Sequence, residues 1–207
     1  YPIIESILRL DLGGRDVTNK LNELIKQKNI GVELNNNIVR DIKEKLCVIG
    51  NDYDNDIKKM ELNQTFVKYE LPDGNIIKLG NEIIESTEIL FKPKMSNINQ
   101  FGISELINES IIKCDIYLKR LLYNNIIFEG GNTLFNGIST RLHNDIKQLI
   151  PNNVDVKIES NKDDYPKYSV WKGASILSDI YSFQQNWMTK NDYQQKGASY
   201  IHEFYFL

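Results

Sequence analysis

Apolar residues in the first hundred positions recur at spacings that predict helices and one hairpin. Asp16 is suited to cap a helix whose apolar stripe is Leu21, Leu24 and Ile25. A longer helix is predicted over residues 38–49, where apolar side chains lie at i, i+4, i+8 and i+11, one face of a 3.6-residue period. These side chains are Ile38, Ile42, Leu46 and Ile49. Residues 66–71 and 75–79 flank a Pro-Asp-Gly turn and predict a β-hairpin.

The remaining pattern adds further strands, helices and one loop. Residues 3–12 are mostly apolar and predict a buried strand that ends at two glycines, whereas residues 91–100 are polar and irregular and predict a loop. Helices are predicted at residues 106–123, 137–149 and 169–185, and short strands at 125–128 and 154–158. Because helices alternate with strands, the pattern indicates an α/β fold in which a small module, residues 13–101, is inserted into a larger one.

Composition and charge narrow the functional classes. The net charge of −3 gives no reason to expect nucleic acid or an anionic membrane as a partner. No apolar run reaches the roughly 18 residues that a membrane-spanning helix needs, and the first residues lack the pattern of a secretory signal. Cys47 and Cys114 are far apart in the sequence and lie near no histidine cluster, so we expect two buried, reduced thiols rather than a disulfide or a metal site.

Three groups of residues are candidates for ligand binding. The first is a strand that ends in Gly130-Gly131 shortly before a helix, where backbone N–H groups can approach a ligand closely, although two glycines at a strand end more often form only a tight turn. The second is the polar face of the 38–49 helix with Arg40, Lys43 and Glu44, which could bind a sugar or phosphate or could simply be solvated. The third is Lys167 before the last predicted helix, although a lone lysine at such a position is usually a surface residue. No catalytic motif and no phosphate-binding loop ending in Lys-Ser/Thr is present.

Six segments, in order along nearly the whole chain, resemble successive segments of actin. They are LRLDLGGRDVT (8–18), IVRDIKEKLC (38–47), YELPDGNIIKLGNE (69–82), IIKCDIYLKRLLYNNIIFEGGNTLFNGISTRL (111–142), KYSVWKGASIL (167–177) and FQQNWMTKNDY (183–193). The resemblance implies the C-terminal half of the two-lobed actin/Hsp70/sugar-kinase fold, whose halves hold ATP or ADP with Mg²⁺ or Ca²⁺ between them. A first residue that is Tyr rather than Met is in keeping with a fragment or a processed chain.

The resemblance also implies a division into subdomains and a set of binding residues. Residues 1–12 and 102–168 would form the inner subdomain, 13–101 the outer one, and 169–207 a segment that packs on the other half. The adenosine side of the cleft would consist of Gly14, Arg40, Lys43, Glu44, Gly130, Gly131, Asn132, Thr133, Leu134, Phe135 and Lys167. A groove for partner proteins would include Ile176, Leu177 and Ile180. No catalytic or metal-binding residue carries over.

Several positions depart from the actin pattern. Asn132, Leu134 and Phe135 replace Thr, Met and Tyr, so any hydrogen bond from that tyrosine hydroxyl is lost. Lys172 and Asn186 stand in the partner groove where actin is apolar. The mostly polar residues 91–100 replace an apolar loop that packs in actin filaments, and the last residues, IHEFYFL, also differ. We therefore expect a divergent actin-like protein.

Several functions fit these observations. The first is an actin-like cytoskeletal ATP-binding protein in the cytoplasm, with other actin-like subunits or actin-binding proteins as partners and no direct contact with nucleic acid or membrane. The second is a non-polymerising actin-related scaffold subunit; an inactive fragment and an unrelated binding module are the remaining alternatives.

The phosphate loops and metal-holding residues of the actin pattern do not match any segment here, so we expect this chain alone not to hydrolyse ATP. We also expect residues 169–207 to expose apolar surface, Trp171, Phe183 and Trp187 included, and to make the isolated chain prone to aggregate.

Overall fold

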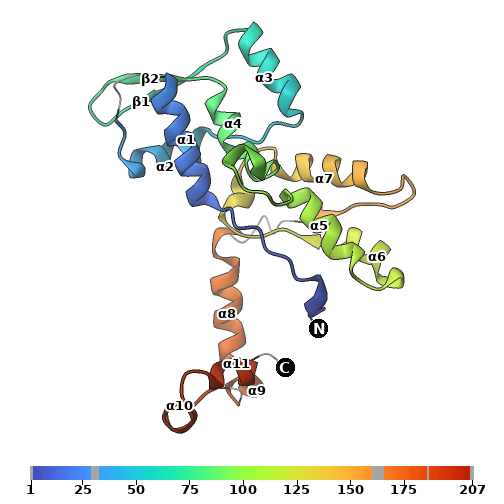
Figure 1. Cartoon of the computed structure of the whole chain (residues 1–207). Coiled ribbons are helices and arrows are strands. Elements are labelled where there is room, and N and C mark those ends of the chain that lie inside the picture. Colours follow the sequence, from blue (N-terminus) through green and yellow to red (C-terminus); the bar gives the residue numbers. More distant parts are fainter. Residues whose placement is uncertain (1, 29–32, 160–165, 186, 206–207) are drawn as a thin grey trace. The chain divides into compact units, whose positions relative to one another are not determined.

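The computed structural model describes residues 2–28, 33–159, 166–185 and 187–205. The chain divides into two compact units, residues 1–167 and 168–207, each of which is described by itself (Figure 1). The first unit contains η1 (Ile4–Ser6), α1 (Gly14–Lys28), α2 (Asn36–Leu46), α3 (Tyr53–Leu62), β1 (Val67–Glu70), β2 (Ile76–Leu79), α4 (Glu82–Glu88), η2 (Pro93–Ser96), α5 (Ile103–Ile112), α6 (Ile116–Tyr123), β3 (Ile126–Ile127), η3 (Gly131–Leu134), α7 (Ile138–Leu149) and β4 (Ile158–Glu159). A short 3₁₀ turn, η4 (Pro166–Tyr168), leads into the second unit with α8 (Ser169–Asp179), α9 (Tyr181–Gln184), α10 (Lys190–Lys196) and α11 (Tyr200–Tyr205).

The larger hydrophobic core of the first unit lies between α1, α2, α4 and the hairpin. Leu21 and Ile25 of α1 are fully buried, as the predicted apolar stripe requires, and α1 packs against both α2 and α4. Asp16 lies in the first turn of α1, where its carboxylate accepts a hydrogen bond from the backbone N–H of Gly13 at 2.8 Å. The same core continues through Phe135 into the start of α7, so it connects residues that lie far apart in the sequence.

A second, smaller core lies around α7 and the parallel pair of β3 and β4. Ile146 of α7 is fully buried there, together with Tyr123, and Ile126 pairs with Ile158 in parallel register. The strand predicted at residues 125–128 is therefore present as the two-residue β3, whereas the two-residue β4 overlaps the strand predicted at residues 154–158 only at Ile158. The helix predicted at residues 137–149 is confirmed as α7.

The predicted hairpin is also confirmed. β1 and β2 pair antiparallel, with Val67 opposite Leu79 and Glu70 opposite Ile76. Gly74 in the turn has a φ of 84°, a conformation that glycine adopts without the steric cost that other residues meet. Along β2 exposed and buried side chains alternate, because successive residues of a strand point to opposite faces.

The predicted buried strand at residues 3–12 is wrong. Ile4 begins a short 3₁₀ helix and is 67% exposed, and Ile7 is 65% exposed. From Ile7 to Leu12 exposed and half-buried residues do alternate, as in a strand. A strand needs a neighbour for its backbone hydrogen bonds, however, and none of the described strands pairs with this segment.

Three of the predicted helices end earlier than their apolar spacing suggests. α2 stops at Leu46, Cys47 after it has extended backbone angles, and the N–H of Ile49 donates to the carbonyl of Asn136 at 2.8 Å. The single helix predicted over residues 106–123 is two helices, α5 and α6, and Asp115 caps the second one. The helix predicted over residues 169–185 is interrupted at Ile180, which has extended backbone angles. In each case the apolar periodicity continues while the backbone changes direction.

Two further helices lie between the predicted elements. α3 has no fully buried residue, but Tyr53, Ile57 and Met60, at i, i+4 and i+7, are partly buried against the larger core, a stripe from which the helix could have been predicted and was not. α4 is buried almost throughout and carries two buried carboxylates, Glu82 and Glu88, which no amphipathic pattern predicts. The segment at residues 91–100 contains one 3₁₀ turn and is otherwise irregular, as expected.

The second unit has no large buried side chain among its described residues. Trp171 is 72% exposed and Trp187 is 51% exposed, while Phe183 is half-buried. This agrees with the apolar surface expected for this segment. Asn186 lies outside the described residues. The predicted subdomain boundaries, with residues 1–12, 13–101, 102–168 and 169–207, stay a prediction.

Candidate functional site

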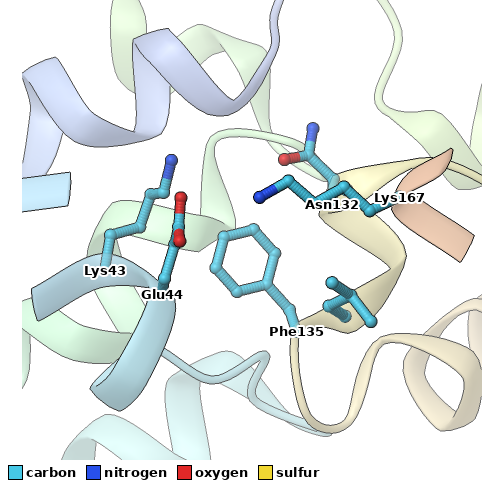
Figure 2. A pocket seen from close by; sticks show the side chains of 7 residues that line it. Lys43, Glu44, Asn132, Phe135 and Lys167 are labelled. Carbon is cyan, nitrogen blue, oxygen red and sulfur yellow. The ribbon is translucent and has the colours of Figure 1, made fainter. Parts of the chain in front are cut away.

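The first unit contains a pocket of about 250 Å³ whose lining residues come from three separate parts of the sequence. They are Lys43, Glu44, Gly131, Asn132, Leu134, Phe135 and Lys167. Figure 2 shows the side chains of Lys43 and Glu44 extending from α2 on one side, with the ring of Phe135 between them and Lys167. The fold therefore brings together residues that are separated by more than a hundred positions in the chain.

α2 positions the first pair of these residues. The Asn35 side chain caps the helix by accepting from the N–H of Asn37 at 3.0 Å. Two turns further on, the ammonium of Lys43 donates to the carbonyl of Gly14 at the start of α1, at 2.9 Å. Burial lowers the pKa of Lys43 because it removes water from the charged form, and neighbouring Glu44 opposes this shift. Lys43 is thus a buried, oriented cation at the edge of the pocket.

The glycine-rich loop forms the opposite wall. Gly130 has a φ of 106°, which disfavours any residue with a Cβ, and its N–H donates to the carbonyl of Pro166 at 3.0 Å. The hydroxyl of Thr133 donates back to the Gly130 carbonyl at 2.8 Å and closes the η3 turn. These bonds hold Gly131 and Asn132 at the pocket and place Lys167, the residue after Pro166, beside them.

Gly14 allows the two walls to approach one another. A Cβ at this position would lie 2.9 Å from the side-chain oxygen of Asn132 and 3.4 Å from the ammonium of Lys43. The first distance is shorter than a carbon–oxygen contact permits, so a larger residue would move Asn132. Gly14 therefore acts as a spacer between α1, α2 and the loop.

The structure brings most of the predicted binding residues together. Seven of the eleven line the pocket, and Gly14 contacts two of those seven. Gly130 and Thr133 shape the loop behind the lining, and Arg40 lies one turn away on α2, with its Nε atom 3.9 Å from a carboxylate oxygen of Glu44. Sequence reasoning did not find the supporting contacts made by Pro166 and Asn136, because both use backbone atoms and have no side-chain signature.

The lining of the pocket suits an organic group better than a metal ion. Among the lining residues that the structure describes, Glu44 is the only carboxylate, whereas Mg²⁺ and Ca²⁺ prefer several oxygen ligands. Within the described part of the chain, no group of three or more His, Cys, Asp or Glu residues could hold a metal. A divalent ion bound next to this pocket would therefore need ligands from elsewhere.

Cys47, immediately after α2, is a buried thiol, as the sequence predicts. It is 5% exposed and contacts the hydroxyl of Ser86 at 3.5 Å, and Cys114 is likewise buried. Burial raises the pKa of Cys47 to about 11 from its usual 9.0.

We expect Cys47 to react slowly with thiol reagents as long as the protein is folded. At pH 8 a rise of about two pKa units leaves roughly one hundredth of the usual thiolate, and the thiolate is the reactive form. The rate of iodoacetamide labelling in a Cys114→Ala variant, followed by mass spectrometry, measures this directly. Labelling as fast as in urea-unfolded protein would contradict the burial of Cys47.

The first unit is thus a mixed assembly of helices and short strands that contains a ligand-sized pocket. No helix in the described part of the chain is long and apolar enough to cross a bilayer. A family model described as Actin matches residues 1–206. The chain therefore belongs to the actin family, and it is an actin-like protein with a fold of mixed helix and sheet content, as the ordered sequence segments predict.

Proposed function

We propose that this chain is part of an actin-like, cytoskeletal ATP-binding protein of the cytoplasm and that, as the C-terminal half, it contributes the adenosine side of the nucleotide cleft. The observation that carries the proposal is the convergence of seven resemblance-derived residues on one pocket of about 250 Å³. Ligand pockets are commonly about 300–1,000 Å³. A pocket at the small end of this scale suits a nucleobase with part of its sugar rather than a complete nucleotide.

The lining supplies suitable chemistry for an adenosine group. Leu134 and Phe135 offer apolar and aromatic surface to the base, and the carboxylate of Glu44 accepts hydrogen bonds from sugar hydroxyls. The Lys43 ammonium already donates to the Gly14 carbonyl, and Lys167 lies at the opposite wall, so these two cations border the base and sugar and do not form a phosphate clamp. In this proposal the rest of the cleft, with Mg²⁺ or Ca²⁺ and the phosphate-binding loops, belongs to other parts of the complete protein.

The proposal predicts that adenosine binds to the chain about as well as ADP does, and that inorganic tripolyphosphate does not compete. We expect a dissociation constant on the order of 1 mM for adenosine, because one side of a cleft supplies only part of the binding free energy. Saturation-transfer NMR with competition measures all three ligands. Leu134→Gln should weaken adenosine binding severalfold, while Leu62→Gln, at an exposed position on α3, should not. Competition by tripolyphosphate but not by adenosine would overturn the assignment.

A second candidate, a non-polymerising actin-related scaffold subunit, is favoured by the loop at residues 91–100. Met95 of this loop packs against the large core instead of extending outward, and the amide of Gln100 exchanges hydrogen bonds with Asp11 at 3.2 and 3.3 Å. A loop held in this way offers little apolar surface to a neighbouring subunit. Sedimentation of the full-length protein with ATP and Mg²⁺ separates the two candidates, because the first predicts pelleted filaments and the second does not.

Partner binding is proposed for the second unit under either candidate. Ile176 is 68% exposed on α8, and Leu177 and Ile180 are each 46% exposed. Exposed apolar side chains of this kind commonly mark interaction sites. The proposed partners are other actin-like subunits or actin-binding proteins.

A further inference from the structure

A segment of three residues, Val48–Gly50, which we name the strap, follows α2 and is held by hydrogen bonds on two sides. Toward α4, the N–H of Val48 donates to the carbonyl of Ile83 at 3.2 Å, and the Val48 carbonyl accepts from the hydroxyl of Thr87 at 2.8 Å. Ile49, at the centre of the strap, is 5% exposed. The strap therefore cannot move away from α4 without breaking bonds that water does not readily replace.

On its other side the strap is bound to the residues that follow the glycine-rich loop of the pocket. The N–H of Ile49 donates to the Asn136 carbonyl at 2.8 Å, and Val48 and Asn136 form a parallel bridge. The guanidinium of Arg141 donates to the Gly50 carbonyl at 2.9 Å. The strap thus joins the end of α2 to the start of α7 through its backbone atoms.

Gly137 lets the start of α7 approach the strap closely. It has a φ of 89°, and an added Cβ would lie 2.5 Å from the carbonyl oxygen of Ile49 and 3.5 Å from its carbonyl carbon. Carbon and oxygen do not pack at 2.5 Å, so a side chain here would push the strap away from α7. Gly74 in the hairpin turn has a similar φ of 84°, but no described atom lies within 4 Å of an added Cβ there. Gly137 is therefore needed for the close contact as well as for its conformation.

Both sides of this contact lead directly to the walls of the pocket. Phe135, which lines the pocket, is the residue before Asn136, and Lys43 and Glu44 lie in the last turn of α2, just before the strap. Phe135 is 8% exposed and packs in the larger core, so its ring does not adjust freely when its backbone moves. A displacement between the strap and Asn136 would therefore change the distance from Glu44 to Phe135.

We propose that the strap sets the spacing between the two walls of the adenosine pocket, and that Gly137 and Arg141 are positioning residues for the ligand although neither lines the pocket. This inference rests on the proposed function, because it assigns to the strap the spacing that a base and its sugar require. A binding site loses affinity when its supporting residues let it loosen by about 1 Å. The other contact between the walls, from Lys43 to the Gly14 carbonyl, uses a flexible lysine side chain and can adapt, whereas the backbone bonds of the strap cannot.

Adenosine binding to Gly137→Ala, with Gly74→Ala as the matched control, tests the proposal. Both variants place a Cβ at a left-handed φ and share that conformational cost, but only the first also pushes on the strap. We expect Gly137→Ala to weaken adenosine binding at least about fivefold in saturation-transfer NMR and Gly74→Ala to leave it within about twofold. In the ligand-free chain, the backbone amide resonances of Glu44 and Asn132 should shift in Gly137→Ala and not in the control. Unshifted resonances in Gly137→Ala would overturn the proposal.

A second variant keeps the test decisive if Gly137→Ala does not fold. Thr87→Val keeps the shape of the side chain but removes the hydroxyl that donates to the Val48 carbonyl. We expect the amide hydrogen of Ile49 to exchange faster in this variant, while that of Ile25 in the core of α1 keeps its rate. Equal acceleration at Ile25 would mean that the substitution only destabilises the whole unit, and the positioning role would then be wrong.

These measurements separate failure of the strap from failure of the proposed function. If the unsubstituted chain does not bind adenosine, the nucleotide assignment is wrong, and the amide resonances and hydrogen exchange of the ligand-free variants still show whether the strap spaces the walls. If the unsubstituted chain binds adenosine and Gly137→Ala binds it equally well, the assignment stands and the positioning role of the strap is wrong.

Discussion

Replacing Arg141 with methionine is expected to lower the free energy of unfolding by about 3 kcal/mol or more, because it leaves a buried carboxylate without its main partner. The guanidinium of Arg141 on α7 donates to both carboxylate oxygens of Glu88 on α4, at 3.0 Å each, and the two side chains are 8% and 1% exposed. Because both side chains are buried, water cannot replace the guanidinium as the partner of the Glu88 carboxylate in this variant.

Further contacts make Arg141 the centre of a network. Its Nε donates to both carboxylate oxygens of Asp145, and a terminal nitrogen donates to the carbonyl of Gly50 at 2.9 Å. The guanidinium also lies 4.6 Å from the ring centre of Phe91. Burial by itself would lower the pKa of Arg141, but hydrogen bonds and charge interactions with Glu88 and Asp145 outweigh it and raise the pKa. The side chain therefore stays charged and joins α4 to α7.

Urea unfolding of matched variants measures this effect. Arg141→Lys should recover only part of the stability, because an ammonium cannot form the two-pronged pair with Glu88. A Glu88→Leu/Arg141→Met double variant should be more stable than the Arg141→Met single variant, since no unpaired charge remains. Lys92, 3.3 Å from Glu88, limits the loss in the single variant. Equal stability of the single variant and the unsubstituted protein would show that the pair contributes nothing.

Replacing Gly102 with alanine is the second substitution with a large expected effect. An added Cβ would lie 1.9 Å from the backbone oxygen of Phe91 and 2.6 Å from its carbonyl carbon. Gly102 has a φ of −71°, so the obstacle is contact with backbone and not its own conformation. The hydrogen bond from Ile103 N–H to the Leu90 carbonyl, at 3.0 Å, holds the close approach, while Gly102 N–H donates to the Glu105 carboxylate at 2.9 Å in the cap of α5.

We expect Gly102→Ala to reduce stability by about 3 kcal/mol, the upper end of the cost of overpacking, because backbone cannot move aside as a side chain does. Gly80→Ala is the matched control, since its added Cβ meets neighbouring atoms only at 3.5 Å or more. Thermal and urea unfolding of both variants gives the comparison. A Gly102→Ala protein as stable as Gly80→Ala would contradict the close contact between residues 91 and 102.

Local patterns were reliable where a single element decides the outcome. The stripe of Leu21 and Ile25 predicted α1, and the Pro-Asp-Gly turn predicted the β1–β2 hairpin, because side-chain direction repeats with the backbone period. They failed where an element depends on a distant partner. The alternating residues at 7–12 find no strand to pair with among those described, and α2 ends at Leu46 because the next residues bond to the loop after η3.

The candidate site shows the same contrast between what local sequence patterns predict and what distant contacts decide. The sequence by itself determined which residues could meet a ligand, since Lys43, Glu44, Phe135 and Lys167 were identified from ordered segments that resemble actin. Only the tertiary structure decided that they surround one pocket, that Gly14 separates its walls, and that Arg141 binds Glu88. In sequence Arg141 looks like a surface residue paired with Asp145 four positions away. Its burial depends on α4, more than fifty positions earlier, and such contacts form only when the whole unit packs.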